Sequence, residues 1–364
     1  MFITIFSLFI AFIYFLLIAC FVRGWNKLPE EKTGEEPCYL FISVIIPFRD
    51  ECENLPSLLE KIAQQTHTCF ELILVNDHST DNSLQVVESF HNFLPNMQLI
   101  QAVGFGKKNA LKEGIAQAKG ELIVCTDADC VPTENWLKAI AQYQSKEACD
   151  MLICPVRMSQ GETFFSKLQA LEFASLIASG AGAAAAGMPI MCNGANMAFT
   201  PNAWSESVAD LNEKEASGDD MFLLMSVKKR GGKIRFVKSK DAMVETIPCA
   251  TFSEFFNQRK RWASKSKSYT DWQVLGVGLL VLLLCVVIMG CGIGGFFDFH
   301  WWKIMVLIWL IKTIADSWLL VKTADFFDTK QVLKQIPILS FIYPFYVCFS
   351  AIGGLLGSFS WKGR

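Results

Sequence analysis

The first 22 residues are almost wholly apolar, and this run limits the possible architecture more than any other part of the chain. A helix of about 20 apolar residues is long enough to cross the hydrocarbon core of a bilayer. A cleaved signal peptide would begin with basic residues, whereas the first charge here, Arg23, follows the apolar run. Arg23 and Lys27 favour a cytoplasmic position for their flank. We therefore predict a transmembrane signal anchor at residues 1–23.

Three more apolar segments lie toward the C-terminal end, at residues 274–297, 301–321 and 336–358. The first two are long enough to span a bilayer. Lysines follow the second of them, which places the turn between the two outside and the later loop inside. Prolines and glycines interrupt the third segment, which fits either a third span or a re-entrant hairpin. We therefore expect transmembrane segments within residues 274–358.

Lys312 and Asp316 lie one helical turn apart inside the second of these segments. Ionisable side chains are costly inside a bilayer, so a functional site is one interpretation of this pair. A pair that joins neighbouring helices is the other interpretation, and we favour it.

The composition is rich in apolar residues for a purely soluble protein. Hydrophobic residues make up 52% of the 364 residues, and mean hydropathy is +0.32. The formal net charge of −2 argues against nucleic acid as a partner. The 13 cysteines have no regular spacing, so we expect neither a zinc site nor a disulfide framework. Many free thiols suit a reducing compartment.

Short apolar, β-branched runs alternate with segments of helical spacing between the anchor and the C-terminal segments. Continuous apolar runs are typical of strands buried on both faces of a sheet. The alternation predicts an α/β domain at residues 38–250 with a mainly parallel sheet and right-handed crossovers. The predicted strands are residues 40–47, 71–75, 97–102 and 121–126, and the predicted helices are residues 55–65, 84–93, 108–118, 164–186, 219–230 and 252–264.

Charged and amide side chains follow each of the predicted strands. Ligands of open parallel sheets bind beyond the carboxyl ends of the strands, so these side chains are candidates for one site. Asp and Asn also favour turns, which explains any one of them alone but explains less well their coincidence at one sheet edge. The residues are Asp50 and Glu51, Asn76 and Asp77, Lys107 and Lys108, and Asp127 and Asp129.

Asp127, Ala128 and Asp129 form a DxD pattern directly after the fourth predicted strand. Two carboxylates one residue apart in a strand-ending turn can both face a divalent cation. Mg²⁺ and Mn²⁺ prefer oxygen ligands, and Mg²⁺ uses few carboxylates together with substrate phosphates. We therefore predict that Asp127 and Asp129 hold Mg²⁺ or Mn²⁺, which would neutralise charge on a leaving diphosphate.

Asp219 and Asp220 begin a predicted helix. Helix capping and a favourable interaction with the helix dipole are the structural explanation for this pair. The functional explanation is a general base that removes a proton from an acceptor hydroxyl. Nothing in the neighbouring sequence decides which of the two would act.

The run QRKRW, from Gln258 to Trp262, lies in an amphipathic segment at residues 251–270. Arg259 and Arg261 can clamp phosphate oxygens through their planar guanidinium groups. Trp262 can stack on a sugar, and a basic anchor with an interfacial Trp on the cytoplasmic side is the alternative explanation. The candidates for membrane-facing residues are Phe252, Phe255, Phe256 and Trp262.

Taken in order, the motifs at residues 40–262 resemble those of family 2 processive-type glycosyltransferases with a GT-A fold, which include polysaccharide synthases. Ceramide glucosyltransferase-like enzymes share these motifs and also have a small membrane part. The motifs are SVIIPFRDE, ELILVNDHSTDNS, GKKNAL, the DxD, CNGANMAF, SGDDMFL and QRKRW.

The resemblance implies a role for each candidate residue, although Asp219 stands where the family usually has Glu. It implies nucleotide contacts at Glu51, Asp77, Lys107 and Asp127, a metal at Asp129 and Asp127, a catalytic base at Asp220 with Asp219 beside it, and diphosphate or acceptor contacts at Gln258, Arg261 and Trp262.

The expected activity is inverting transfer of a hexose or N-acetylhexosamine from a nucleotide diphosphate sugar, with a UDP-sugar favoured. The small membrane part favours a lipid or lipid-linked acceptor at the cytoplasmic membrane face over a growing polysaccharide. A non-catalytic membrane protein that binds nucleotides or lipids is the other alternative. We expect an integral protein of a bacterial inner membrane, in contact with membrane lipids, with its catalytic domain in the cytoplasm.

Overall fold

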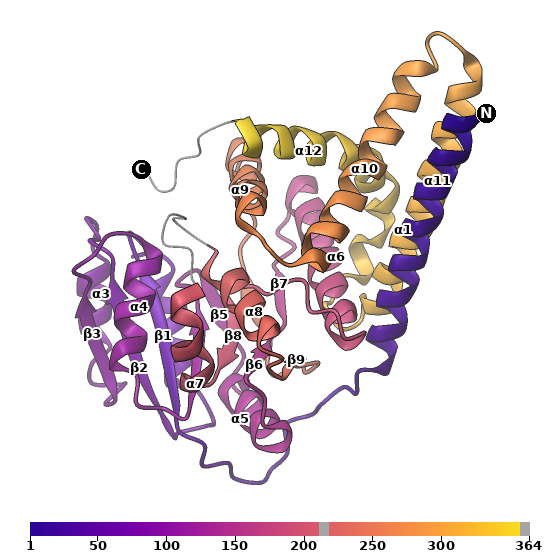
Figure 1. Cartoon of the computed structure of the whole chain (residues 1–364). Coiled ribbons are helices and arrows are strands. Elements are labelled where there is room, and N and C mark those ends of the chain that lie inside the picture. Colours follow the sequence, from indigo (N-terminus) through magenta and orange to yellow (C-terminus); the bar gives the residue numbers. More distant parts are fainter. Residues whose placement is uncertain (211–217, 357–364) are drawn as a thin grey trace. The chain divides into compact units, whose positions relative to one another are not determined.

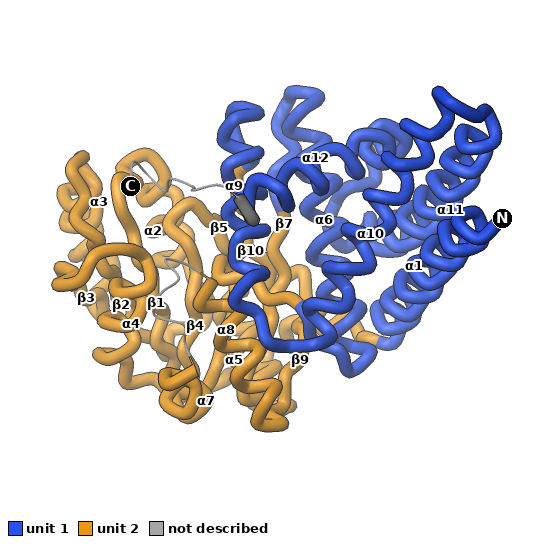
Figure 2. Tube along the Cα trace, turned by 45° about the horizontal axis from the view of Figure 1, so that its top comes forward, with its two compact units in different colours: residues 1–27, 158–190, 248–364 blue, residues 28–157, 191–247 orange. Residues whose placement is uncertain are grey.

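A computed structural model describes residues 1–210 and 218–356, which form two compact units (Figure 1). Figure 2 shows unit 1, which contains Met1–Lys27, Met158–Ile190 and the chain from Pro248 onward, and unit 2, which contains Leu28–Arg157 and Met191–Ile247. The last two residues of the third predicted C-terminal segment, 357–358, lie outside the described part.

A mixed, mainly parallel sheet forms the centre of unit 2, as the sequence predicts. Strands β1 to β4 run parallel to one another, β8 is antiparallel to both β4 and β6, and β9 is parallel to β6. The order across the sheet is β3 (Met97–Gln101), β2 (Phe70–Asn76), β1 (Ile42–Phe48), β4 (Leu122–Thr126), β8 (Asn196–Phe199), β6 (Met151–Ile153) and β9 (Ile234–Phe236).

Burial on both faces explains why β1 is a continuous apolar run, since every residue of ISVIIPF is buried. Its register aligns Ile42 with Phe70 of β2 and with Leu122 of β4. Helix α4 packs against β1 and β2 through Gly114, where a Cβ atom would lie 2.8 Å from Ile45. The helices in the first half of unit 2 are α2 (Leu55–Ala63), α3 (Ser83–Ser89), α4 (Lys107–Gln117) and α5 (Trp136–Glu147).

Short elements complete unit 2, and most of them are absent from the sequence-based expectations. A small sheet has the order β5 (Cys130–Pro132), β10 (Val244–Thr246) and β7 (Val156–Met158). Helix α7 (Pro201–Ser207) and the 3-10 turn η1 (Val208–Asp210) precede α8 (Asp219–Lys229), and α8 lies where the sequence predicts a helix.

Long apolar helices form most of unit 1. In the described part of the chain, five segments are long and apolar enough to cross a membrane: α1, α6, α10, α11 and residues 330–354, which include α12. The sequence predicts a helix at α6 but not a candidate span. The elements are α1 (Phe2–Lys27), α6 (Phe164–Ala185), α9 (Phe252–Ser264), η2 (Lys265–Ser268), α10 (Trp272–Gly294), α11 (Phe299–Thr323), η3 (Lys330–Gln335) and α12 (Ile336–Leu356).

Close helix packing holds α1 within unit 1. Helix α1 runs beside α11 (Figure 1) and also packs against α6. A Cβ atom on Gly24 would lie 2.1 Å from the carbonyl oxygen of Gly182, and one on Gly182 would lie 2.3 Å from that of Phe21. The small residues of α6 therefore allow the two backbones to touch.

Lys312 and Asp316 join helices, as favoured from the sequence. Their side chains form an ion pair of 2.5 Å along α11, and Tyr14 of α1 donates a hydrogen bond of 2.5 Å to the second carboxylate oxygen. The Lys312 ammonium lies 4.0 Å from the ring centroid of Tyr343 in α12. The cluster thus connects α1, α11 and α12.

Candidate functional site

Hydrogen bonds tie the loop after β1 to the loop after β2 in unit 2. The backbone N–H of Asp50 donates to Ser79 Oγ at 3.0 Å, and that of Glu51 donates to Ser83 Oγ at 2.8 Å. Asp50 has a φ of 50°, a left-handed conformation that Asp adopts more readily than most residues. Its carboxylate accepts the N–H of Thr80 at 2.7 Å. These contacts fix Glu51 just beyond the carboxyl end of β1.

Asp77 lies just beyond β2 and is almost wholly buried, with 1% of its surface exposed. One carboxylate oxygen accepts the N–H of Gly106 at 2.9 Å, and the other, Oδ2, has no hydrogen-bond partner among the described residues. His78 follows and stacks on Phe105, with 4.2 Å between the ring centroids. A buried polar atom without a partner is costly, so Oδ2 is suited to accept a hydrogen bond from a ligand.

Lys107 and three carboxylates share one neighbourhood at this sheet edge. The Lys107 ammonium forms an ion pair with Asp127. Burial lowers the pKa of Lys107, but the charge of Asp127 and the weaker effects of Asp220 and Asp129 outweigh it, so the pKa is raised overall. The structure therefore brings together four of the residues that the sequence assigns to one site.

Asp127 and Asp129 provide a donor set that fits a divalent cation. Burial raises the pKa of Asp129 to about 6, and the charges of Asp127 and Glu51 act in the same direction. A cation between such carboxylates would relieve both effects. Among the described residues, no group of three or more His, Cys, Asp or Glu side chains is placed to hold a metal. Two carboxylates completed by phosphate oxygens remain consistent with Mg²⁺ chemistry.

Asp219 and Asp220 start α8 but have different surroundings. Asp219 is buried and lies 3.4 Å from the ammonium of Lys108. Burial raises the pKa of Asp219, and Lys108 offsets part of that effect. Asp220 is half-buried, and its Oδ2 accepts the backbone N–H of Gly194 at 3.0 Å. Asp220 is therefore the more accessible carboxylate, held in one orientation.

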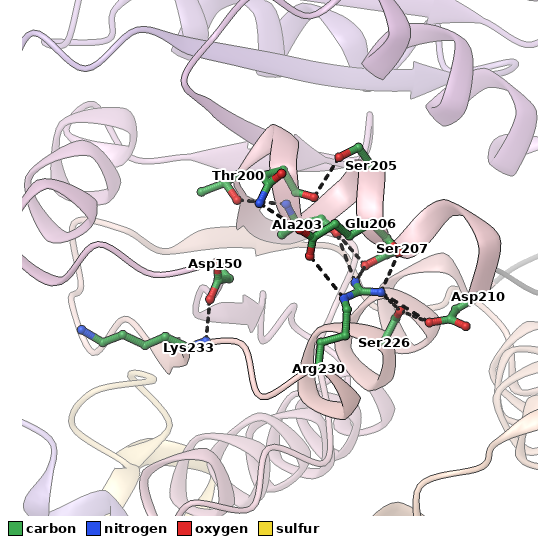
Figure 3. Close-up of polar contacts among 11 residues, drawn as sticks. Asp150, Thr200, Ala203, Ser205, Glu206, Ser207, Asp210, Ser226, Arg230 and Lys233 are labelled. Carbon is green, nitrogen blue, oxygen red and sulfur yellow. Dashed lines mark hydrogen bonds and ion pairs between the residues drawn. The ribbon is translucent and has the colours of Figure 1, made fainter.

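An Arg230 network connects the two ends of the α7–α8 region (Figure 3). The guanidinium donates to the carbonyl oxygen of Glu206 at 2.6 Å, to Ser226 Oγ at 2.9 Å and to Ser207. It also pairs with Asp210 at 3.4 Å. The network fastens the end of α7 to the last turns of α8, the helix that carries Asp220.

Replacing Arg230 with Met should therefore destabilise unit 2. Loss of several hydrogen bonds from a charged group is expected to cost about 2 kcal/mol. For a unit of this size we expect the thermal unfolding midpoint to fall by about 5 °C. Lys229→Met is the matched control. The Lys229 side chain is largely exposed, and its ammonium makes one long ion pair of 3.8 Å with the Asp210 carboxylate. Equal midpoints for the two variants, measured in detergent, would contradict the role of the network.

Gln258, Arg261 and Trp262 belong to unit 1, on the last turns of α9. The helix begins at Phe252 because Thr251 and Glu254 form a capping box, in which the Glu254 N–H donates to Thr251 Oγ1 at 3.2 Å. All three motif side chains are half-buried.

Two expectations for this helix are wrong. Arg259 is not available to clamp phosphate, because its side chain is 5% exposed and forms an ion pair with Glu172. Phe255 does not face a membrane, because it is buried and packs edge-on against Tyr346 at 5.7 Å. Phe252 remains largely exposed.

Several residues that shape the site were not identified from the sequence. Gly194 lies within CNGANMAF and holds Asp220, and the Asn-Gly pair in that run is a turn signal that could have indicated a backbone contact. His78 and Phe105 meet across 27 residues, and the sequence contains no signal for that contact.

Two glycosyl transferase families match this chain, and their matched ranges together include every candidate site residue. The family described as "Glycosyl transferase family 2" matches residues 43–200. The family described as "Glycosyl transferase family group 2" matches residues 122–351, more than half of the chain.

Similar proteins include an undecaprenyl-phosphate 4-deoxy-4-formamido-L-arabinose transferase from Proteus mirabilis, 32% identical over 147 residues. They also include a poly-beta-1,6-N-acetyl-D-glucosamine synthase from Staphylococcus epidermidis, 28% identical over 137 residues. The matches cover 39% and 37% of this chain, and 44% and 33% of the two relatives. The chain thus spans less than half the length of either relative.

A solved structure resembles nearly the whole chain. The mannosyltransferase PcManGT from Pyrobaculum calidifontis, in complex with GDP-Man and Mn²⁺, superposes with a TM-score of 0.58 and 16% identity. The superposition covers 97% of each chain. At this identity the likeness concerns the fold, and it confirms the predicted GT-A architecture.

Proposed function

Because the chain belongs to glycosyl transferase family group 2, we propose that it is an inverting glycosyltransferase. It would move a hexose or N-acetylhexosamine from a nucleotide diphosphate sugar to a lipid or lipid-linked acceptor at the cytoplasmic membrane face. The observation that carries this proposal is the position of the half-buried Asp220 carboxylate. The backbone N–H of Gly194 orients it, and it lies close enough to Lys107 to raise the pKa of that lysine.

In the proposed reaction Asp220 acts as the general base. Its carboxylate takes the proton of the acceptor hydroxyl while that oxygen attacks the anomeric carbon of the donor sugar. A bond forms between these two atoms as the bond from the anomeric carbon to the diphosphate breaks. The nucleoside diphosphate leaves with the electron pair, and a single displacement inverts the anomeric configuration.

Charges at the sheet edge would hold the donor diphosphate. We propose that Asp127 and Asp129 bind Mg²⁺ or Mn²⁺ together with phosphate oxygens, and that Lys107 contacts the same phosphates. The bound cation would supply charge neutralisation for the leaving diphosphate. The description of the similar mannosyltransferase with GDP-Man and Mn²⁺ supports this assignment.

Asp77 supports uridine as the donor nucleoside. One of its oxygens already accepts the Gly106 N–H, which leaves Oδ2 for a ligand. The imide N–H of uracil is a single donor that suits one oxygen, whereas the adjacent N–H groups of guanine would use both. Glu51, fixed beyond the neighbouring strand, is the second proposed nucleotide contact.

The membrane-proximal helix favours a lipid acceptor. We propose that Arg261 contacts the diphosphate, and that Gln258 and Trp262 contact the acceptor. Exposed Phe252 on the same helix suits insertion at a lipid surface. The undecaprenyl-phosphate sugar transferase among the relatives supports a lipid acceptor. The polysaccharide synthase among them supports the alternative, in which the acceptor is a growing polysaccharide.

The proposed location is a bacterial inner membrane with unit 2 in the cytoplasm. The candidate membrane-spanning helices support an integral membrane protein. All 13 cysteines are free thiols and lie within the described part of the chain, which suits a reducing compartment.

A panel of labelled UDP-, GDP- and dTDP-sugars tests the activity. Purified full-length protein with bacterial lipids and Mg²⁺ or Mn²⁺ should release nucleoside diphosphate from a UDP-sugar, and a chelator should abolish the release. An absence of turnover with every donor would contradict the proposal and favour a binding protein.

Product size distinguishes the two acceptors. We expect the labelled sugar to enter a product that extracts into organic solvent and carries one or a few sugars. A ladder of long water-soluble chains made by the purified protein would refute the lipid acceptor.

A further inference from the structure

A buried ion pair and a hydrogen bond join three helices of unit 1 at Arg259, the second residue of the QRKRW run. Arg259 of α9 pairs with Glu172 of α6, and their side chains are 5% and 3% exposed. The second Glu172 oxygen accepts the hydroxyl of Tyr346, from α12, at 2.9 Å. Burying two charges carries a large desolvation cost, so such a pair is weak evidence for stability alone.

Besides the ring of buried Phe255, at 4.4 Å, Arg259 contacts two residues that are proposed to meet the acceptor. Its Nη1 donates to Gln258 Oε1 at 2.5 Å, and its guanidinium carbon lies 4.2 Å from the Trp262 ring centroid. A guanidinium only donates hydrogen bonds, so the amide oxygen of Gln258 must face it. The amide NH₂ of Gln258 is therefore directed elsewhere, and one face of Trp262 is covered.

We propose that Arg259 is a positioning residue for sugar transfer, an inference that rests on the proposed function. Held by Glu172, whose other oxygen accepts the Tyr346 hydroxyl, Arg259 sets Gln258 to present its NH₂ group and Trp262 to present one ring face. Arg259 itself does not touch substrate. Its planar group contacts the carboxylate, the amide and the indole together, which an ammonium cannot do.

The first test is Arg259→Lys in purified full-length protein. This change keeps the charge beside Glu172, so we expect normal membrane insertion and an unfolding midpoint within about 2 °C of the wild type. We expect kcat to fall at least about tenfold while the donor KM changes less than about threefold. Wild-type kcat, or a loss of kcat that accompanies unfolding, would overturn the proposal.

A charge-free pair separates positioning from stability. Arg259→Met combined with Glu172→Gln removes both buried charges and leaves an amide oxygen for Tyr346. We expect this protein to fold and still to lose at least about tenfold in kcat. Full activity would show that Arg259 only balances the charge of Glu172.

The matched control is Lys260→Met on the same helix. The Lys260 ammonium lies 4.9 Å from the centroid of the Phe256 ring. Lys260→Met removes one positive charge from the helix, as Arg259→Met does. Its kcat should stay within about threefold of the wild type. A loss equal to that of Arg259→Lys would show that the effect is common to changes anywhere on this helix and would overturn the proposal.

A double-mutant cycle asks whether Arg259 acts through its two neighbours. In protein that carries Gln258→Ala and Trp262→Leu, Arg259→Lys should cost less than about twofold, because its targets are gone. The full tenfold loss in that background would overturn the proposal.

Near-ultraviolet circular dichroism tests the cluster without turnover. The difference between the wild type and Trp262→Phe defines the signal of Trp262. We expect the Arg259→Met, Glu172→Gln protein to lose this signal, and its retention would overturn the proposed positioning. A wild-type protein that turns over no donor would instead refute the proposed function.

Discussion

Replacing Asp220 with Asn is expected to lower the turnover number for sugar transfer by about 10³-fold, within the range that general bases contribute. Asn has nearly the same shape, and its carbonyl oxygen can still accept the N–H of Gly194. It cannot take the proton of an acceptor hydroxyl. Affinity for nucleoside diphosphate should stay within about threefold of the wild type, because the proposed nucleotide contacts are elsewhere. Turnover with a labelled donor and nucleotide titration measure the two quantities.

Asp219→Asn is the neighbouring comparison. Asp219 is buried and pairs with Lys108, so Asp219→Asn should lower stability more than Asp220→Asn does. Its loss of turnover should be at least about tenfold smaller than that of Asp220→Asn. The reverse order of losses would move the catalytic base to Asp219. Full transfer activity in Asp220→Asn would remove the base from this residue.

Trp262→Leu is expected to lower turnover by at least about 100-fold, equivalent to about 2.7 kcal/mol. Leu still partitions at the headgroups, but it offers no flat ring for an acceptor and no partner for the Arg259 guanidinium. A misplaced acceptor loses the benefit of preorganised orientation. Transfer assays and the membrane-bound fraction measure activity and insertion independently.

Phe252→Leu serves as the control for the membrane anchor. Phe252 is exposed on the same helix and carries no proposed acceptor contact. Its replacement should leave turnover within about threefold. If Trp262→Leu inserts normally and keeps near-full turnover, Trp262 is an interfacial anchor and has no part in binding the acceptor.

The parallel half of the sheet could be predicted because its strands are buried on both faces. Runs such as ISVIIPF are then almost continuously apolar. The polar residues that follow such strands lie at one edge of the sheet, because the carboxyl ends of parallel strands meet there. The gathering of Lys107, Asp127 and Asp129 follows from that edge, whereas Asp220 lies in the first turn of α8 and was assigned to the site only by the family resemblance. The helix at α9 was equally predictable, because a capping box and amphipathic spacing mark its start and its faces.

The antiparallel part was not predictable from local pattern. Strand β8 has four residues, and β6 and β9 have three each, which is too short for a periodicity to stand out. Their pairing depends on partners far along the chain.

Distant partners also explain the errors at Arg259 and Phe255. Glu172 lies 87 residues before Arg259, and Tyr346 lies beyond both. The QRKRW run therefore resembles a purely exposed basic segment. Only the packing of α6, α9 and α12 shows which of its arginines is buried.

The anomeric configuration of the first product tests the central claim most directly. Wild-type protein would receive a UDP-sugar whose sugar is α-linked to the diphosphate, together with membrane lipid acceptor, and nuclear magnetic resonance would assign the new linkage. A single displacement with Asp220 as the base predicts a β-linked product. An α-linked product would contradict the inverting mechanism and the role of Asp220.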